Sequence, residues 1–164
     1  MYNKEEIINL LKLEQIDFTL KEHIPVYTID EMKTLKFPRF QLVAKNLFVR
    51  DDKKRNYELI VVSQDKTVNL KELQSQIQTR RLSFASENDL NLYLGLKKGS
   101  VTPLGMLNDE NHRVRMWIDT FFKEKDIGIH PMNNDATIWL KSDDLVSLLK
   151  KYGHHVEWLE IKKS

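Results

Sequence analysis

Apolar and polar residues alternate along the first twenty residues with two different periods. Apolar side chains within residues 7–11 follow helical spacing, behind Asn3 and Glu6, which have the spacing of a capping box. Residues 17–21 instead alternate every second position, as a half-buried strand does. The N-terminal pattern therefore predicts a capped helix followed by a strand.

The same reading predicts elements along the rest of the chain. Residues 41–50 and 57–63 are rich in strand formers, and the polar DDKKRN between them predicts a hairpin. A short helix capped by Thr28 and Glu31 must end before Pro38. The remaining expected elements are helices over 69–78, from Ser86 with Asp89, and from Ser142 to Gly153; strands over 81–85, 114–118, 137–140 and 156–161; and a loop over 95–105.

Strands and helices alternate in this pattern, while the hairpin requires antiparallel pairing. The expected fold is therefore α+β (α/β mixed), with a mixed, mostly antiparallel sheet flanked by helices. The length of 164 residues suits one domain, 1–164, and no repeat or Pro/Gly-rich linker divides it.

Composition narrows the class of protein. The absence of cysteine excludes a disulfide framework, thiolate catalysis and cysteine-based zinc sites. Charges within MYNKEEIINLLKLEQ interrupt any apolar core of a signal peptide, and no apolar run approaches the roughly 20 residues that span a bilayer. We expect a cytoplasmic protein that does not bind membranes.

Positive charge is concentrated locally although the net charge is only +2. Residues 45–55 carry an excess of basic side chains, and Arg80 with Arg81 forms a second small cluster. Such patches attract phosphate and give salt-dependent binding. A solvated hairpin tip is the alternative interpretation of the DDKKRN turn.

Most familiar catalytic signatures are missing. The chain has no GxGxxG, GxxxxGK[ST], GxSxG or HExxH motif. His154 and His155 are adjacent on a predicted strand, so their side chains point to opposite faces and do not easily hold one metal ion. Asp143 and Asp144 lie where a helix begins and complement its dipole. We expect no metal and no cofactor.

Three local features remain. Alternation places Lys45 on an apolar strand face, either as an edge-strand lysine reaching water or as a functional cation. Gly99 to Pro103 form a tight GSVTP loop, either a plain connector or a backbone that points N–H groups at an anion. His130, next to proline in a polar loop, is either merely exposed or placed for hydrogen bonding and proton transfer.

Together these features resemble a known family. VAKNLFVRDDKKRNYELIVV, RRLSFAS, LGLKKGSVTPLGMLND and IGIHPMNNDATIWL, preceded by HIPVYTIDE, follow the order and spacing of the YbaK-like editing domains related to the domain inserted in bacterial prolyl-tRNA synthetases. The similarity runs from about His23 to the C-terminal strand. It is closest to the stand-alone trans-editing deacylases of alanyl-tRNA(Pro).

The resemblance implies roles for individual residues. Lys45 would hold the phosphate backbone at the tRNA 3′ end, and Asn46 would support the adjacent loops. His130 would line the amino-acid pocket, while Tyr27 and Thr28 would border the terminal adenosine. Backbone N–H groups of the GxxxP loop would stabilise the oxyanion of the ester. The catalytic candidates are Lys45, Gly99, Ser100, Val101 and His130, and the substrate-binding candidates are Tyr27, Thr28, Asn46, Thr102, Pro103 and Arg80.

The implied activity is metal-independent hydrolysis of a mischarged Ala-tRNA(Pro) ester by water, which the ribose hydroxyl of the substrate activates. A pocket shaped for proline discriminates poorly against smaller amino acids, because missing methylenes change binding by only about 1–3 kcal/mol. The implied partner is the acceptor end of tRNA(Pro), reached with prolyl-tRNA synthetase or by free encounter, and not DNA. Deacylation of Cys- or Ser-tRNA, a non-catalytic module that binds tRNA ends, and a purely structural domain are the alternatives.

Overall fold

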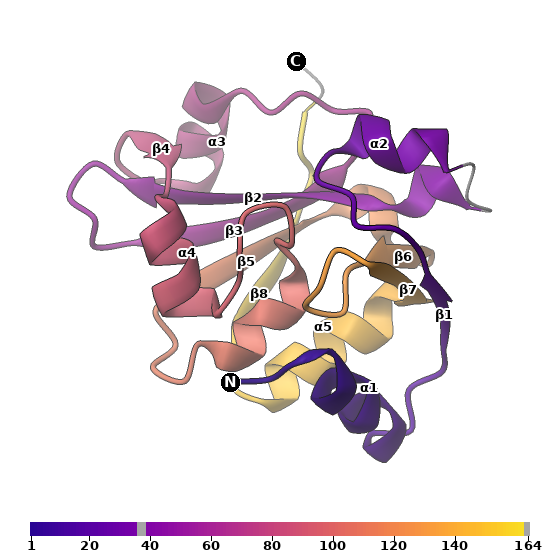
Figure 1. Cartoon of the computed structure of the whole chain (residues 1–164). Helices are drawn as coiled ribbons and strands as arrows, with labels where there is room; N and C mark the ends of the chain where they lie inside the picture. Colours follow the sequence, from indigo (N-terminus) through magenta and orange to yellow (C-terminus); the bar gives the residue numbers. More distant parts are fainter. Residues whose placement is uncertain (36–38, 163–164) are drawn as a thin grey trace.

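The computed structural model describes residues 1–35 and 39–162, which form two β-sheets with helices packed around them (Figure 1). The five-stranded sheet has the order β4-β2-β3-β5-β8, and the three-stranded sheet has the order β1-β7-β6. The strands are β1 (Phe18–Glu22), β2 (Ala44–Asp51), β3 (Tyr57–Ser63), β4 (Leu82–Phe84), β5 (Val114–Asp119), β6 (Asp126–Ile129), β7 (Ala136–Lys141) and β8 (His155–Leu159).

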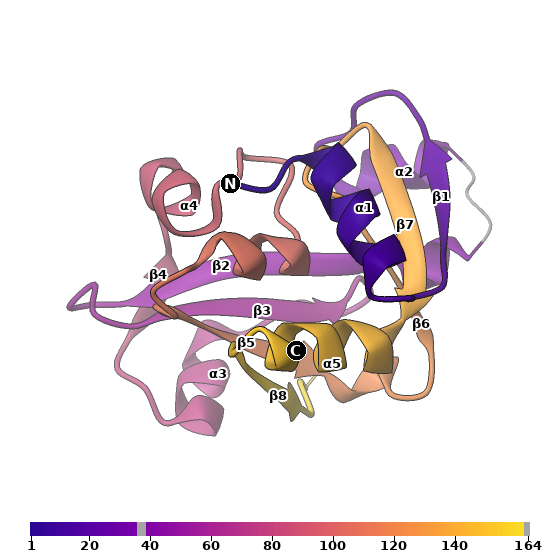
Figure 2. The same ribbon diagram turned by 90° about the horizontal axis from the view of Figure 1, so that it is seen from below.

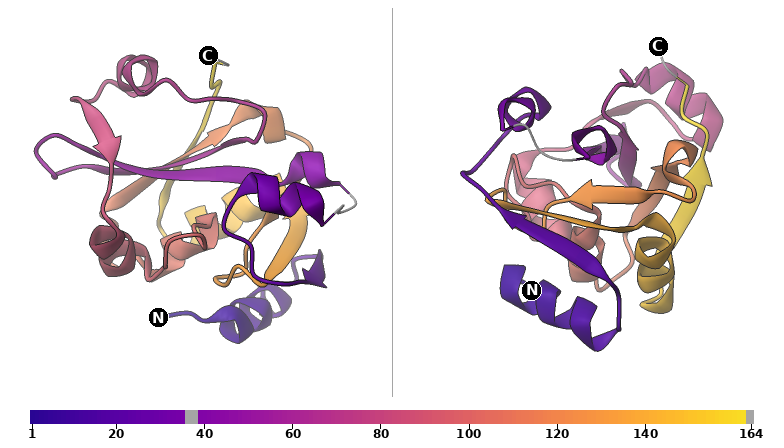
Figure 3. Two further views of the ribbon diagram at one scale, coloured as in Figure 1. Left: turned by 45° about the horizontal axis from the view of Figure 1, so that its top comes forward. Right: turned by 90° about the vertical axis from the view of Figure 1, so that its right-hand side faces the viewer.

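Helices cover both faces of the five-stranded sheet, because strands such as β3 carry apolar side chains on both faces. In β3, Leu59 and Val61 face one core cluster, while Ile60 and Val62 face another. Helix α3 (Leu70–Ile77) covers the second face, and α4 (Glu87–Leu94) lies on the first (Figure 3). Helices α1 (Lys4–Leu13) and α5 (Ser142–Lys151) also pack into the first cluster (Figure 2).

Pairing in the larger sheet is mixed. The β2–β3 hairpin is antiparallel and places Lys45 opposite Val62. Strand β4 pairs with β2 only over Val49–Asp51, while β3–β5 and β5–β8 are parallel. Near Lys45 the β2 strand therefore has β3 on one side, and its other side is open to the smaller sheet.

The two sheets meet at a parallel bridge between Val43 and Gly128. A third apolar cluster lies at this junction, formed by Val26, Met32, Val43 and Trp139. Helix α2 (Ile29–Thr34) contributes Met32 to this cluster. The junction brings the start of β2, the end of β6 and the segment before α2 together.

The structure confirms the predicted fold class and most predicted elements. The capping box of Asn3 and Glu6 is formed, and the Thr28 side chain accepts a hydrogen bond from the Glu31 N–H. The short helix ends at Thr34, before Pro38, which lies outside the described residues. No helix of the described part of the chain is long and apolar enough to cross a membrane.

Three local expectations are wrong. Residues 40–42 form a 3₁₀ turn rather than the first part of the hairpin strand, following Arg39 at φ +57°. Ser142 does not cap α5, because its Oγ donates to the buried Phe122 carbonyl at 2.5 Å and Lys141 takes the cap position without a side-chain bond. The last three residues of the expected loop over 95–105 instead begin a 3₁₀ helix, Pro103–Asn108.

Strand β6 was not among the expected elements, and the strands divide between two sheets rather than joining one. Residues 126–129 are few and include Gly128, which weakens a strand signal. The partner strand β7 pairs with both β1 and β6, so the smaller sheet depends on contacts between distant parts of the chain.

Candidate functional site

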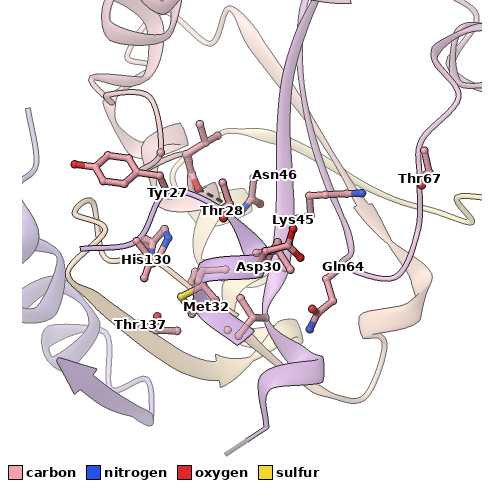
Figure 4. A pocket seen from close by; sticks show the side chains of 18 residues that line it. Tyr27, Thr28, Asp30, Met32, Lys45, Asn46, Gln64, Thr67, His130 and Thr137 are labelled. Carbon is pink, nitrogen blue, oxygen red and sulfur yellow. Dashed lines mark hydrogen bonds between the residues drawn. The ribbon is translucent and has the colours of Figure 1, made fainter. Parts of the chain in front are cut away.

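A pocket of about 660 Å³ opens at the junction between the two sheets (Figure 4). Its lining comes from the segment before and within α2, the start of β2, the loop after β3, the GSVTP loop, and the ends of β6 and β7. The lining residues are Val26, Tyr27, Thr28, Ile29, Asp30, Met32, Val43, Ala44, Lys45, Asn46, Gln64, Thr67, Gly99, Val101, Gly128, Ile129, His130 and Thr137.

Lys45 extends from β2 along the wall of this pocket (Figure 4). Its Nζ donates to the Lys66 carbonyl in the loop after β3. Burial lowers the pKa of the Lys45 ammonium below its usual range, because an apolar surrounding disfavours the charged form. The lysine is therefore held inside the pocket, where its two other N–H donors can meet an anion.

Asn46, the next residue on β2, contacts the GSVTP loop. Its Nδ2 donates to the Val101 carbonyl at 3.3 Å, so this side chain bonds to the backbone of the adjacent loop. The Asn46 Oδ1 is buried and has no hydrogen-bond partner among the described residues. Gln64, in the loop after β3, also bonds to backbone, since its Nε2 donates to the Phe40 carbonyl at 2.5 Å.

The GSVTP loop approaches the pocket through backbone rather than side chains. Gly99 has φ +85°, and a Cβ there would lie 2.5 Å from Tyr27 Cδ1, so the loop passes directly against the tyrosine ring. The Ser100 N–H donates to the Lys97 carbonyl at 3.0 Å. Within the described residues, the Gly99 and Val101 N–H groups donate no hydrogen bond, so both are available to a ligand.

His130 follows the end of β6 and faces the pocket with its tautomer fixed. Its Nδ1 is 2.9 Å from the Ala136 carbonyl, which only accepts hydrogen bonds, so Nδ1 carries the proton. Burial is the largest effect on this ring and lowers its pKa, with the nearby His23 acting in the same direction. The lowered pKa favours the uncharged ring, in which Nε2 is an acceptor.

The segment before α2 is tied to the loop that carries His130. Val26 and Asn134 exchange two hydrogen bonds, from the Val26 N–H to the Asn134 carbonyl at 3.1 Å and from Asn134 Nδ2 to the Val26 carbonyl at 2.7 Å. His23 Nε2 lies 3.0 Å from Thr137 Oγ1. Tyr27, with 64% of its surface exposed, stands at the pocket mouth beside Thr28 (Figure 4).

The structure brings together most, but not all, of the candidate residues. The pocket lining includes Tyr27, Thr28, Lys45, Asn46, Gly99, Val101 and His130. Ser100, Thr102 and Pro103 are buried behind the lining, where the Thr102 Oγ1 accepts from the Leu104 N–H and Pro103 begins the 3₁₀ helix. Sequence reasoning did not select Gln64, Thr67 or Thr137, which reach the pocket only through tertiary packing.

Arg80 lies outside the pocket lining, near the end of the hairpin. Its guanidinium pairs with Asp52 through bonds of 2.6 and 3.0 Å on the exposed surface. Asp51, in the same turn, is buried and accepts hydrogen bonds from the Arg55 and Asn56 N–H groups. Both acids of DDKKRN are therefore engaged within the protein, and Lys53, Lys54 and Arg55 remain exposed.

The arrangement suits a polar ester or phosphate next to a small apolar group. One ammonium and two unengaged N–H groups can face negative charge, while a neutral histidine supplies an acceptor. Val26, Met32 and Val43 are each at most 4% exposed and form an apolar side of the cavity. Among the described residues, no group of three or more His, Asp or Glu side chains is arranged to hold a metal ion.

Comparison with known proteins identifies a family for this chain. Residues 23–148 match the model of the aminoacyl-tRNA editing domain. The prolyl-tRNA editing protein ProX of Acetoanaerobium sticklandii is 40% identical over 159 residues, 96% of this chain and 97% of that protein. The mouse (Mus musculus) prolyl-tRNA synthetase associated domain-containing protein 1 is 35% identical, with 81% of each chain covered.

A solved structure of a proposed trans-editing enzyme for prolyl tRNA synthetase has the same fold. It aligns with a TM-score of 0.72 at 16% identity and covers 100% of this chain and 99% of that chain. The sequence match and the shared fold agree with the motifs around Lys45, Gly99 and His130. The chain belongs to the YbaK-like family of aminoacyl-tRNA editing deacylases.

Proposed function

We propose that this protein removes alanine from mischarged tRNA(Pro) as a stand-alone, trans-editing deacylase. The main observation that supports this proposal is that Lys45, the Gly99–Val101 backbone and His130 lie around one pocket although they are far apart in the sequence. The similarity to the prolyl-tRNA editing protein ProX supports prolyl tRNA as the substrate. The substrate enters with its 3′ end, because only that end carries the ester.

Each wall of the pocket has a role in this reaction. The Lys45 ammonium holds a phosphate of the terminal nucleotides, and the exposed Tyr27 ring packs on the adenosine. The N–H groups of Gly99 and Val101 stabilise the oxyanion that forms when water attacks the ester carbonyl. The water is activated by the ribose hydroxyl of the substrate. Ser100 is buried outside the lining, which supports water rather than serine as the nucleophile.

The apolar side of the pocket supports alanine over serine. The apolar side formed by Val26, Met32 and Val43 offers no hydrogen-bond partner to a serine hydroxyl. The Thr137 hydroxyl is already within 3.0 Å of His23 Nε2. Proline is excluded because it is larger than the amino acids that this editing pocket accepts. The editing pocket then hydrolyses the esters of smaller amino acids that the synthetase pocket cannot reject. Cysteine is nearer to alanine in polarity and is the alternative substrate within the family.

The test is deacylation of Ala-, Pro-, Cys- and Ser-tRNA(Pro) by wild type and by Lys45→Ala. Loss of the pocket ammonium is expected to lower kcat/KM for Ala-tRNA(Pro) by about 10- to 100-fold, because a hydrogen bond to a charged group contributes about 1.5–3 kcal/mol. Lys150→Ala, an exposed lysine on α5, is the matched control and should retain wild-type turnover.

Each outcome has a distinct meaning. Rapid loss of alanine alone supports the proposal, while a preference for cysteine or serine changes the substrate and keeps the reaction. If none of the four esters is hydrolysed although tRNA binds, the proposal fails, and the domain is then a module that binds tRNA ends without catalysis.

A further inference from the structure

The loop after β3 contacts the pocket lysine through its backbone and the protein interior through a side chain. The carbonyl of Lys66 accepts the hydrogen bond from Lys45 Nζ. The Lys66 side chain is directed away from the pocket, with its Nζ 2.9 Å from Asp119 Oδ1 and 2.8 Å from the Ile161 carbonyl. One residue therefore connects the pocket ammonium to the buried carboxylate of Asp119.

Asp119 holds the Lys66 side chain in a fixed position. The residue is fully buried at the end of β5, where its Oδ2 accepts from the Ser63 N–H at 3.0 Å and its Oδ1 accepts from the Phe121 N–H at 3.1 Å. Ser63 ends β3, the strand from which the loop departs. The carboxylate thus fixes the beginning of the loop and the Lys66 side chain together.

The position of the Lys45 ammonium depends on this loop. Lysine has a flexible four-carbon stem, so its charged end needs a fixed acceptor to hold one place. The Lys45 side chain extends from β2 toward the segment that carries Thr67, and Gln64 lies on the same wall (Figure 4). If the loop shifts, the Lys66 carbonyl shifts with it, and the ammonium follows or becomes mobile.

We propose that Lys66 is a positioning residue, whose ion pair with buried Asp119 places its own carbonyl to hold Lys45 where the tRNA phosphate binds. The inference rests on the proposed function for its catalytic consequence, although the placement of Lys45 is independent of it. Loss of Lys66 would leave the fully buried Asp119 carboxylate without its charge partner, so the pair strongly favours one conformation. The lowered pKa of Lys45, which burial causes, fits an ammonium confined in this place.

The test compares two ion pairs whose carboxylates, on neighbouring strands of the same sheet, are both fully buried. Lys66→Met/Asp119→Asn removes both charges at the loop and avoids leaving either one buried alone. Arg115→Met/Glu58→Gln is the matched control, since Glu58 is also fully buried and pairs with Arg115 away from the pocket lining. Lys66→Arg keeps the positive charge and serves as the conservative variant.

Two measurements separate positioning from stability. The first is the ¹³Cε NMR signal of Lys45, assigned with Lys45→Met and followed as a function of pH. The second is kcat/KM for Ala-tRNA(Pro) at a temperature at which every variant is folded. Loss of the loop pair is expected to shift the Lys45 signal, to move its pKa toward the ordinary lysine value, and to lower kcat/KM by about 10- to 100-fold, as a misplacement of about 1 Å does.

The control pair should lose thermal stability without changing either measurement, and Lys66→Arg should recover most of the lost turnover. An unchanged Lys45 signal in Lys66→Met/Asp119→Asn overturns the positioning role. Equal losses of kcat/KM in the loop pair and the control pair overturn it as well. If wild type hydrolyses no ester, the proposed function fails, and the Lys45 signal still decides whether Lys66 places the ammonium.

Discussion

Gly99→Ala tests whether the GSVTP loop must lie against Tyr27 for catalysis. Gly99 has φ +85°, a left-handed conformation that costs an alanine about 1–2 kcal/mol. The new Cβ would also lie 2.5 Å from Tyr27 Cδ1 and 3.3 Å from Cε1. Because Tyr27 is 64% exposed, its ring can move away, so we expect a total loss of about 1–3 kcal/mol of unfolding free energy.

The same substitution should affect activity far more than stability. A loss of this size lowers the melting temperature by about 2–4 °C per kcal/mol in a chain of this length, so the variant stays folded at 25 °C. Displacement of the Tyr27 ring or of the Gly99 N–H disturbs the adenosine contact or the oxyanion donor. We expect kcat/KM for Ala-tRNA(Pro) to fall by about 10- to 100-fold.

Gly153→Ala is a close control for this experiment. Gly153 has φ +87°, and a Cβ there would lie 2.9 Å from the His112 ring, well separated from the pocket lining. The two variants should lose similar stability in urea unfolding, while Gly153→Ala keeps wild-type deacylation. Equal turnover in both variants at 25 °C would refute the assignment of Gly99 to the reacting part of the loop.

Three further predictions concern single side chains. Ser100→Ala should change single-turnover deacylation by less than about threefold, because Ser100 lies outside the pocket lining; abolished turnover with intact folding and tRNA binding would indicate an acyl-enzyme instead. Arg80→Ala should leave stability almost unchanged, because its pair with Asp52 is exposed. It should lower the slope of log K for tRNA binding against log salt concentration by about one, and an unchanged slope would show that Arg80 does not contact the RNA. Burial, with His112 nearby, lowers the pKa of His154, so the unfolded state binds more protons and stability should fall as pH drops below about 6.5. His154→Phe should reduce this loss of stability between about pH 7 and pH 5, measured by urea unfolding. An equal loss in the variant and in wild type would contradict the assignment to His154.

Local sequence signals determined much of the fold. Caps at Asn3, Thr28 and Ser86 depend on a side chain and an N–H three residues later, so they are readable from spacing alone. The β2–β3 hairpin follows from two apolar runs around a polar turn. Ser142 had a similar capping pattern, yet its hydroxyl bonds to Phe122, twenty residues away, which spacing cannot predict.

The candidate site was only partly visible in the sequence. Lys45, Gly99 and His130 are unusual in their local context, and the resemblance to a known family gave them roles. Each signal was ambiguous in isolation, because a strand lysine or a glycine loop is common without function. The structure added that all three line one pocket, and that the Lys45 ammonium donates to the Lys66 carbonyl.

By itself, the sequence determined the fold class, most of the elements and the family of this protein, because capping, periodicity and motif order are properties of neighbouring residues. Only the tertiary structure decided that the strands divide between two sheets and that a pocket opens where Val43 meets Gly128. It also decided that Gln64, Thr67 and Thr137 line that pocket and that Asp119 anchors Lys66. These contacts join residues far apart in the chain, and their geometry follows from how buried surfaces and buried charges pack together, which local patterns do not encode.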